Sequence, residues 1–321
     1  MDHTRLGSSG LTVSRLALGC MSFGDTSRMP WALDHDAAEP VFRTAVELGI
    51  TFWDTANIYG LGSSEEIVGK AITEYSDRES IVLATKLFSR MHEGPGGSGL
   101  SRKAILEKID ASLTRLGTDY VDLYQIHRFD PETPVEETME ALHDVVKAGK
   151  VRYLGASSMH AWQFAKLQST ADLNGWTRFV SMQDQYSLLM REEEREMLPY
   201  CAATGVGTIP WSPLARGRLT RPFDQETART DTDEFGKRLY RDDDGRIVDA
   251  VADVARGRGV SPAQVALAWV LRNPVVSAPI VGTTKPHHLD DAVAATTLVL
   301  DDDEVARLEE HYTPRENAGF A

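Results

Sequence analysis

Short apolar runs alternate with longer amphipathic stretches along almost the whole chain. The amphipathic stretches have the spacing of helices with one buried face, and they include Ala37–Leu48, Lys103–Leu116, Val135–Lys147 and Trp162–Ala171. The apolar runs have the length and composition of buried strands, and they begin at Leu16, Ile50, Ile81, Val121, Val151, Phe179, Val206 and Ser277. Strands that alternate with helices pair in parallel, and eight such units close into a barrel. The pattern therefore predicts an α/β fold of the (β/α)8 TIM-barrel type.

Turn and capping residues indicate where several elements begin and end. The triplet Ser8–Gly10 has turn chemistry and lies inside the segment Thr4–Arg15, which predicts a short N-terminal β-hairpin before the barrel. Ser101 is the expected N-cap of the helix that follows it, and Gly117 is its expected C-terminal stop. These local signals agree with the boundaries that the periodicity alone suggests.

Two segments do not belong to a minimal barrel. Pro213–Gly245 is a charged, irregular connection after the seventh strand (Val206–Ser212), and loops of this size on the carboxyl face of a barrel often act as lids. Asp301–Glu304 is expected to begin an extra C-terminal helix, and capping explains its four acids better than a metal does. We expect residues 1–321 to form a single barrel domain.

Composition narrows the possible partners and the compartment. The chain has 48 acidic and 34 basic residues, a net charge of −14, and no basic stripe, so nucleic acid is not an expected partner. Cys20 and Cys201 are the only cysteines, which argues against a disulfide framework and for a reducing compartment. No apolar stretch approaches the length of a membrane span, and the amino end lacks a signal-peptide pattern. We expect a cytoplasmic protein without a membrane partner.

Four polar side chains lie where three consecutive apolar segments stop. Asp54 and Tyr59 belong to the segment ITFWDTANIYG, Lys86 ends SIVLATK, and His127 ends YVDLYQIH. The carboxyl ends of parallel strands open onto one face of a barrel, so the four groups are expected to meet there. An acid, a phenol, an amine and an imidazole in a half-buried pocket suit proton-coupled carbonyl chemistry.

The four side chains have complementary chemical tasks. A buried Lys86 needs a partner, because an unpaired buried ammonium costs several kcal/mol, and Asp54 is the natural one. A phenol in water titrates near ~10, and a neighbouring cation favours its ionised form, so Lys86 would make Tyr59 a usable general acid near neutral pH. His127 can donate a hydrogen bond to a substrate oxygen and orient it.

These segments resemble signatures of the aldo-keto reductases, whose members carry an Asp, Tyr, Lys and His tetrad at the corresponding places. The resemblance covers almost the whole chain through GLSRK, YVDLYQIHRFDPETPVEETMEAL, VKAGKVRYLGASS, SMQDQYSLLMREEEREMLP, IPWSPLARGRL and APIVGTTKPHHL. The chain is similar to the bacterial branch related to potassium-channel β-subunits and to reductases named after 1-deoxyxylulose-5-phosphate synthesis. The resemblance implies an NADPH-dependent oxidoreductase that reduces aldehydes or ketones, with no metal and with the tetrad as its catalytic residues.

The resemblance also implies which residues contact a nicotinamide cofactor. Those expected at its nicotinamide end are Gly19, Cys20, Met21, Asp54, Ser157, Ser158, Gln183 and Trp211, and those along its pyrophosphate are Ser212, Leu214, Gly217 and Leu219. Trp211 occupies the position that stacks on the nicotinamide ring. Ser157, Ser158 and Gln183 would hold the carboxamide, although relatives often carry Asn where this chain has Ser158.

Residues after the eighth strand are expected to bind the adenosine end, namely Gly282, Thr283, Thr284, Lys285, His288 and Asp291. Lys285 and His288 would face a 2′-phosphate, which predicts a preference for NADPH over NADH. Asp291 would contact adenine, whereas Ala292 replaces an Asn that relatives often use there. Because the net charge of −14 opposes capture of a phosphorylated dinucleotide at long range, the preference must arise locally.

A small carbonyl compound is the expected substrate, although the sequence specifies neither this compound nor the oligomeric state. Candidates to line its pocket are Met21, Phe23, Trp31, Ile58, Phe88, Arg128, Phe129 and Trp211. Arg128 could clamp a phosphate or carboxylate, or it could pair with Asp130 at the surface.

Two other functions stay open at this stage. One is a pyridine-nucleotide-sensing regulatory subunit, against which His127 argues, because the channel subunits carry Asn there. The other is a non-redox barrel isomerase or lyase, in which the Asp–Lys pair would serve Schiff-base chemistry. Trp211 and Gln183, at nicotinamide-contacting positions, argue against the second alternative.

Overall fold

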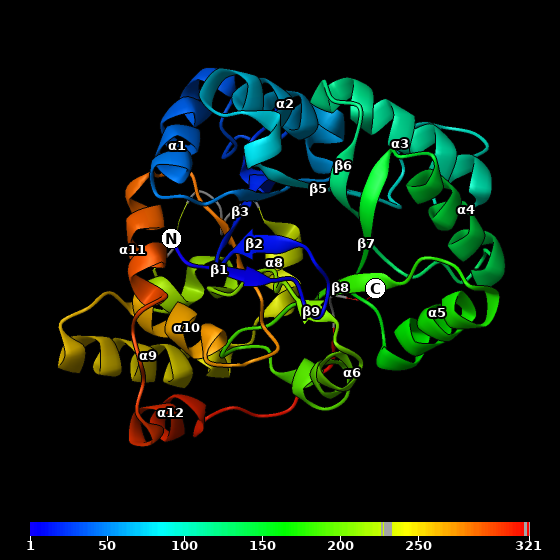
Figure 1. Cartoon of the computed structure of the whole chain (residues 1–321). Coiled ribbons are helices and arrows are strands. Elements are labelled where there is room, and N and C mark those ends of the chain that lie inside the picture. Colours follow the sequence, from blue (N-terminus) through cyan, green and yellow to red (C-terminus); the bar gives the residue numbers. More distant parts are fainter. Residues whose placement is uncertain (226, 228–232, 318–319, 321) are drawn as a thin grey trace.

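Eight parallel strands form the centre of the computed structural model, and helices surround them (Figure 1). The structure describes residues 1–225, 227, 233–317 and 320. In chain order the barrel strands are β3 (Ala17–Gly19), β4 (Phe52–Asp54), β5 (Val82–Leu87), β6 (Val121–Ile126), β7 (Val151–Ser157), β8 (Phe179–Gln183), β9 (Gly207–Thr208) and β10 (Ile280–Gly282). Each strand from β3 to β8 pairs with the strand that follows it in the chain, and β10 returns to pair with β3. A bridge between Thr208 and Val276 joins the remaining two edges and closes the barrel.

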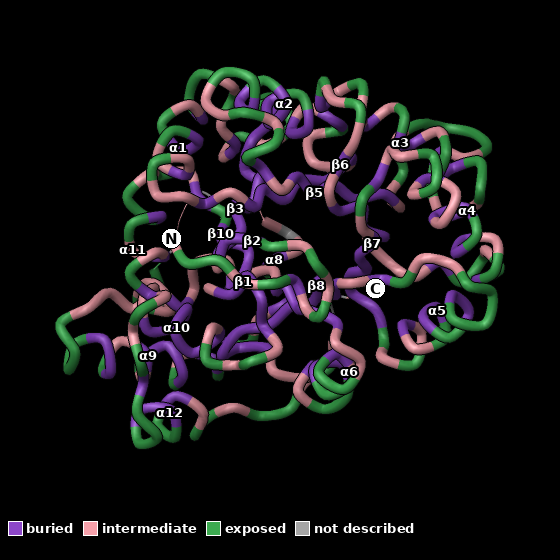
Figure 2. The backbone as a smooth tube through the Cα atoms, in the orientation of Figure 1, coloured by how far each residue is buried: buried purple, intermediate pink, exposed green. Residues whose placement is uncertain are grey.

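The helices other than α8 (Glu234–Leu239) lie outside the strands, as the predicted alternation requires. The described helices are α1 (His35–Glu47), α2 (Ser63–Tyr75), α3 (Arg102–Leu116), α4 (Val135–Lys147), α5 (Ala161–Asn174), α6 (Met197–Thr204), α8, α9 (Gly245–Arg258), α10 (Pro262–Leu271), α11 (His287–Ala295) and α12 (Asp302–Glu309). The ring of helices is exposed on its outer side and buried where it meets the strands (Figure 2). The prediction of an α/β barrel is confirmed.

Capping groups act at the helix ends where the sequence indicated them. Ser101 Oγ accepts a hydrogen bond from the N–H of Ala104 at 3.3 Å, and α3 ends at Gly117 with φ +63°. At α12, Asp301 accepts from the N–H of Glu304 at 2.8 Å, which shows an acid serving as a cap.

The N-terminal hairpin closes the amino end of the barrel. It consists of β1 (His3–Arg5) and β2 (Thr12–Ser14), which pair antiparallel and lie across the middle of the ring of helices in Figure 1. Leu6 and Val13 are fully buried against apolar side chains inside the barrel. Gly7 has φ +59°, and a Cβ there would lie 2.4 Å from the carbonyl oxygen of Gly205, so the hairpin approaches the barrel as only glycine permits. Because the hairpin covers the amino end, a functional site is expected at the carboxyl end of the barrel.

The strands are shorter than the apolar runs that predicted them. The seventh strand, expected over Val206–Ser212, is limited to β9, because Pro210 has no N–H to continue the ladder. The run from Ser277 becomes a strand only at β10, directly after Pro279, for the same reason. Tyr59 lies in a helical turn after β4 and not at a strand end.

The long connection after β9 is partly ordered. Its described part contains a turn at Ala215–Thr220 and helix α8, while residues 226 and 228–232 lie outside the described residues. An ion pair of 2.5 Å between Arg216 and Asp233 holds this part together. The ring of Phe235 lies 6.3 Å from that of Trp211, so the connection folds back over the carboxyl face. This position agrees with a lid.

Two further observations concern membrane spans and metal sites. None of the helices in the described part of the chain has the length and apolar character needed to cross a bilayer. Nor do the described residues include three or more His, Cys, Asp or Glu side chains grouped so that they could hold a metal ion.

Candidate active site

Three members of the predicted tetrad are in direct contact at the carboxyl end of the barrel. Lys86 on β5 is fully buried, and its Nζ lies 2.5 Å from Asp54 Oδ2 at the end of β4. The same nitrogen donates to the carbonyl oxygen of Thr55 at 2.8 Å and to Tyr59 Oη at 3.4 Å. One ammonium group thus links the carboxylate, the backbone and the phenol.

The environment of Lys86 keeps it charged. Burial alone would lower the pKa of Lys86, but the neighbouring Asp54 and Tyr59 outweigh burial and raise the pKa above its ordinary value. Lys86 is therefore a cation that faces the phenol, and it lacks the neutral amine that a nucleophile needs.

His127 completes the tetrad from the loop after β6. Its ring lies 5.9 Å from the ring of Tyr59 in an edge-to-face arrangement, and its backbone N–H donates to Leu87 at 2.8 Å. Burial lowers the pKa of His127 well below its usual value, and the charges of Lys86 and Arg128 lower it further. The imidazole is therefore neutral, and as a neutral ring it can donate only one hydrogen bond.

Two glutamines donate hydrogen bonds to the carboxylate oxygen of Asp54 that does not face Lys86. Gln125 Nε2 donates to Asp54 Oδ1 at 2.8 Å, and Gln183 Nε2 donates to the same oxygen at 3.1 Å. Gln183 Nε2 also donates to Gln125 Oε1 at 3.0 Å, so both of its hydrogens are used and Oε1 is left as its free acceptor. Sequence reasoning missed Gln125. The feature of the sequence that could have identified Gln125 is a polar residue at an inward-facing position of β6, and the structure pairs it in register with Lys86.

The residues expected at the carboxamide end lie together at the ends of β7 and β8. Ser157 Oγ donates to the carbonyl oxygen of Gln183 at 2.7 Å and lies 3.1 Å from Ser158 Oγ. Trp211 Nε1 donates to Ser158 Oγ at 3.1 Å. Hydroxyl and amide groups therefore gather beside the indole of Trp211. On β3 and just after it, Gly19 and Cys20 are buried and Met21 is partly exposed.

The loop after Trp211 has an unusual backbone. Ser212, Ala215, Arg216 and Gly217 all have positive φ, between 49° and 88°. Successive residues that combine right-handed and left-handed conformations can turn their N–H groups toward a common point, a known way to hold an anion. Leu214 is half-buried beside them. The side chain of Leu219 is fully buried in the core, so only its backbone could serve a ligand.

The expected phosphate-binding residues lie around the amino end of α11. Thr283 Oγ1 accepts from the N–H of Lys285 at 2.9 Å and lies 3.0 Å from His288 Nδ1. Burial lowers the pKa of His288, and the neighbouring His287 and Lys285 lower it further. Asp291 Oδ1 accepts a hydrogen bond from Gln264 Nε2 at 2.9 Å. Gly282 and Thr284 are exposed and half-buried, respectively.

Most of the residues predicted to line the substrate pocket are partly exposed, namely Met21, Trp31, Ile58, Phe88, Arg128, Phe129 and Trp211. Phe23 needs correction. It is fully buried with its ring 4.6 Å from that of Phe42 on α1, so it fills the space between barrel and helix and has no surface for a ligand.

Arg128 does not make the surface pair with Asp130 that the sequence left open. Its Nη1 donates to the carbonyl oxygen of His127 at 2.7 Å. Asp130 is buried and accepts instead from Leu100 N–H at 2.7 Å and from Thr133 Oγ1 at 2.8 Å. The guanidinium also interacts electrostatically with Tyr59 and Asp184, so it faces the site.

Comparison with known proteins supports the same conclusion as the geometry. A sequence model of the Aldo/keto reductase family matches residues 15–313, and the chain belongs to that family. It is 46% identical over 338 aligned positions, covering 98% of each chain, to a protein of Aspergillus parasiticus named versiconal hemiacetal acetate reductase. It is 43% identical to an aldo-keto reductase of Fusarium vanettenii (100% and 94% coverage) and 45% identical to a provisionally named aryl-alcohol dehydrogenase of Schizosaccharomyces pombe (96% and 95%). The protein is an oxidoreductase of this family.

Proposed function

We propose that the chain reduces an aldehyde or ketone to an alcohol with NADPH, and that Tyr59 is the general acid. The observation that carries the proposal is the buried cation Lys86, held by Asp54 and 3.4 Å from the hydroxyl of Tyr59. A cation at this position stabilises the negative charge that a phenol acquires when it gives up its proton.

The residues present fit a nicotinamide dinucleotide. Gln183 Oε1 is left as an acceptor for a carboxamide N–H, and the hydroxyls of Ser157 and Ser158 lie beside it. Trp211 offers a ring face on which the nicotinamide could stack. The positive-φ loop that follows Trp211 suits a pyrophosphate. Lys285 and His288, at the amino end of α11, suit a 2′-phosphate. When bound, NADPH supplies a hydride for the carbonyl carbon and leaves as NADP⁺.

Proton transfer is the task of the tetrad. The O–H bond of Tyr59 breaks as its proton moves to the carbonyl oxygen, and the bond formed there completes the alcohol hydroxyl. Lys86 stabilises the phenolate that remains, and Asp54 with its two glutamines holds Lys86 in place. The neutral His127 can donate its single hydrogen bond to the carbonyl oxygen and orient it beside Tyr59.

The alternative functions have less support. In Schiff-base chemistry Lys86 would need a neutral, reachable amine, but it is fully buried, bound to three acceptors, and has a raised pKa. A regulatory subunit without turnover would not need His127 next to Tyr59, where the ring is held 5.9 Å away.

Aromatic carbonyl compounds are the substrate class that we favour. The names of two relatives refer to an aryl alcohol and to a hemiacetal acetate. Aromatic and apolar side chains on the same face, among them Phe88, Phe129 and Trp211, suit a flat apolar ring.

The test combines a panel of aromatic and aliphatic aldehydes and ketones with the variant Tyr59→Phe. We expect NADPH consumption by the wild type, and a loss of about 10²–10⁴-fold in the variant, the range typical of a general acid. NADPH binding should be unchanged, because only the hydroxyl is removed. A variant that reduces carbonyls at nearly the wild-type rate would overturn the assignment.

A further inference from the structure

Asp184 is a buried acid directly behind the residues expected to hold the carboxamide. It follows Gln183 at the end of β8, and its Oδ1 accepts a hydrogen bond from the N–H of Ser158 at 2.7 Å. Ser158 has φ +51°, a left-handed conformation that is unfavourable for a residue other than glycine. The carboxyl of Asp184 therefore helps to hold Ser158 in a conformation that its backbone does not favour.

The same residue also bonds to the Trp211 segment. The N–H of Trp211 donates to the carbonyl oxygen of Asp184 at 2.9 Å, while Trp211 Nε1 donates to Ser158 Oγ at 3.1 Å. Asp184, Ser158 and Trp211 thus form one hydrogen-bonded unit, and a displacement of Asp184 would move the two groups that face the nicotinamide ring and its carboxamide.

The second oxygen of Asp184 lies against the buried carboxyl of Glu193. The backbone N–H of Met159 also interacts with the Asp184 carboxyl, but Oδ2 is buried and makes no regular hydrogen bond with the described residues. Its carboxyl neighbour is Glu193, which could itself carry a hydrogen for it. Two ionised carboxylates in contact out of water repel strongly, so the pair retains one proton. Burial raises the pKa of both groups, and the charge of Asp184 raises that of Glu193 further.

Other charged and titratable groups around the pair do not remove this need for a proton. Arg128, from the loop after β6, attracts Asp184, but its charge is shared with Tyr59. Glu192, from the same turn as Glu193, adds repulsion. Cys201 on α6 also faces the two carboxyls, and burial raises its pKa, so the thiol is neutral.

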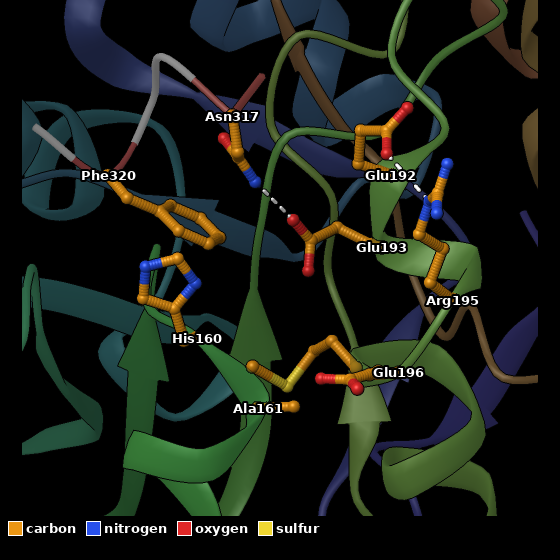
Figure 3. A pocket seen from close by; sticks show the side chains of 9 residues that line it. His160, Ala161, Glu192, Glu193, Arg195, Glu196, Asn317 and Phe320 are labelled. Carbon is orange, nitrogen blue, oxygen red and sulfur yellow. Dashed lines mark hydrogen bonds and ion pairs between the residues drawn. The ribbon is translucent and has the colours of Figure 1, made fainter. Parts of the chain in front are cut away.

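The C-terminal segment holds Glu193 from the other side. Asn317 Nδ2 donates to Glu193 Oε1 at 2.5 Å, and Figure 3 shows this contact at the wall of a cavity of about 470 Å³. The N–H of Arg315 donates to Glu192 at 2.9 Å, and the guanidinium of Arg315 pairs with Asp244 at 2.5 Å. The C-terminal segment is therefore connected to the site through Glu193, and the cavity gives the pair a route to exchange its proton with solvent.

We propose that Asp184 is a positioning residue of the nicotinamide site, and that a proton shared with Glu193 and a hydrogen bond from Asn317 keep it in place. The inference rests on the proposed function, because it concerns the site that would hold the cofactor. Loss of the shared proton would let the two carboxylates separate, and Ser158 would lose its acceptor. Since the proton is held above the ordinary carboxyl range and is lost as the pH rises, cofactor affinity should fall in alkaline solution.

The test measures the Kd for NADPH by protein fluorescence between about pH 6 and about pH 11 in the wild type, Glu193→Gln and Glu193→Ala, a range that spans the raised pKa of Glu193. A glutamine keeps an N–H donor for Asp184 and an oxygen for Asn317 but cannot ionise. Glu304→Gln is the matched control, because Glu304 is also a buried, hydrogen-bonded acid but lies on α12 beside Arg258.

We expect Glu193→Gln to match the wild type at pH 6 and to bind NADPH at least fivefold more tightly than the wild type at about pH 11, because the pKa of Glu193 is raised to about 10. Glu193→Ala should bind at least fivefold more weakly than the wild type at pH 6, and the control should follow the wild type at both pH values. Wild-type affinity in Glu193→Ala, or the same pH dependence in Glu193→Gln as in the wild type, would overturn this inference alone. A wild type that binds no NADPH would overturn the proposed function as well.

Discussion

Replacing Lys86 by Met separates the structural and chemical roles of the buried ion pair. Methionine has a similar volume and no charge, so the variant leaves Asp54 buried without its cation. Breaking a buried pair by removal of one partner costs about 3–5 kcal/mol. The lower end of this range applies here, because Gln125 and Gln183 still donate to Asp54 at 2.8 Å and 3.1 Å.

The catalytic effect follows from the distance between the ammonium and the phenol. Unit charges at the 3.4 Å between Lys86 Nζ and Tyr59 Oη attract by about 5 kcal/mol at an effective dielectric constant of about 20, before the opposing charge of Asp54 is considered. If a net of about 1.4–2.7 kcal/mol of this acts in the transition state, carbonyl reduction slows by about 10- to 100-fold.

Two further variants make the assay discriminating. In Asp54→Asn/Lys86→Met the uncompensated charge is gone and the amide still offers an oxygen to both glutamines, so most of the stability should return while activity stays low. Arg115→Met breaks another buried pair, in which Arg115 Nε lies 2.6 Å from Glu65, and should lose stability but keep activity. Urea unfolding and kcat/KM for one aldehyde measure both quantities. Wild-type kcat/KM in Lys86→Met, or recovery of activity in the double variant, would refute the reasoning.

Two other predictions concern the ligands. Arg128→Ala should reduce kcat/KM about tenfold or more for an aldehyde that carries a carboxylate or phosphate and little for a neutral aldehyde, because the guanidinium faces the site; equal losses for both substrates would exclude a clamp. NADPH should bind at least tenfold more tightly than NADH, about 1.4 kcal/mol, because Lys285 and His288 lie at the amino end of α11. Lys285→Ala should remove most of that difference and leave NADH affinity unchanged, as fluorescence titration can measure; equal affinities in the wild type would contradict the assignment.

Local sequence was sufficient for the order of elements and for the tetrad. The repeated change from apolar runs to amphipathic stretches depends on backbone geometry within each segment, and a capping residue such as Ser101 acts on the N–H groups of its own helix. The ends of parallel strands must share one face, so Asp54, Lys86 and His127 could be assigned to a common site before any contact was known.

Contacts between segments that are distant in sequence were decided only by the tertiary structure. Alternation along a strand indicates that Gln125 faces inward, but only the pairing of β5 with β6 brings it to Asp54. Phe23 has the composition of a pocket residue, yet its packing against α1 buries it completely.

Asp184 and Glu193 are the clearest case. In the sequence Glu193 belongs to a charged run and Asp184 lies among uncharged residues, and the expected place for an acid is the surface. The structure buries them against each other, with Ser158 on one side and Asn317 on the other. Burial and like charge together determine that the pair keeps a proton. Neither can be predicted from the linear sequence, because both depend on which groups the fold buries next to each other.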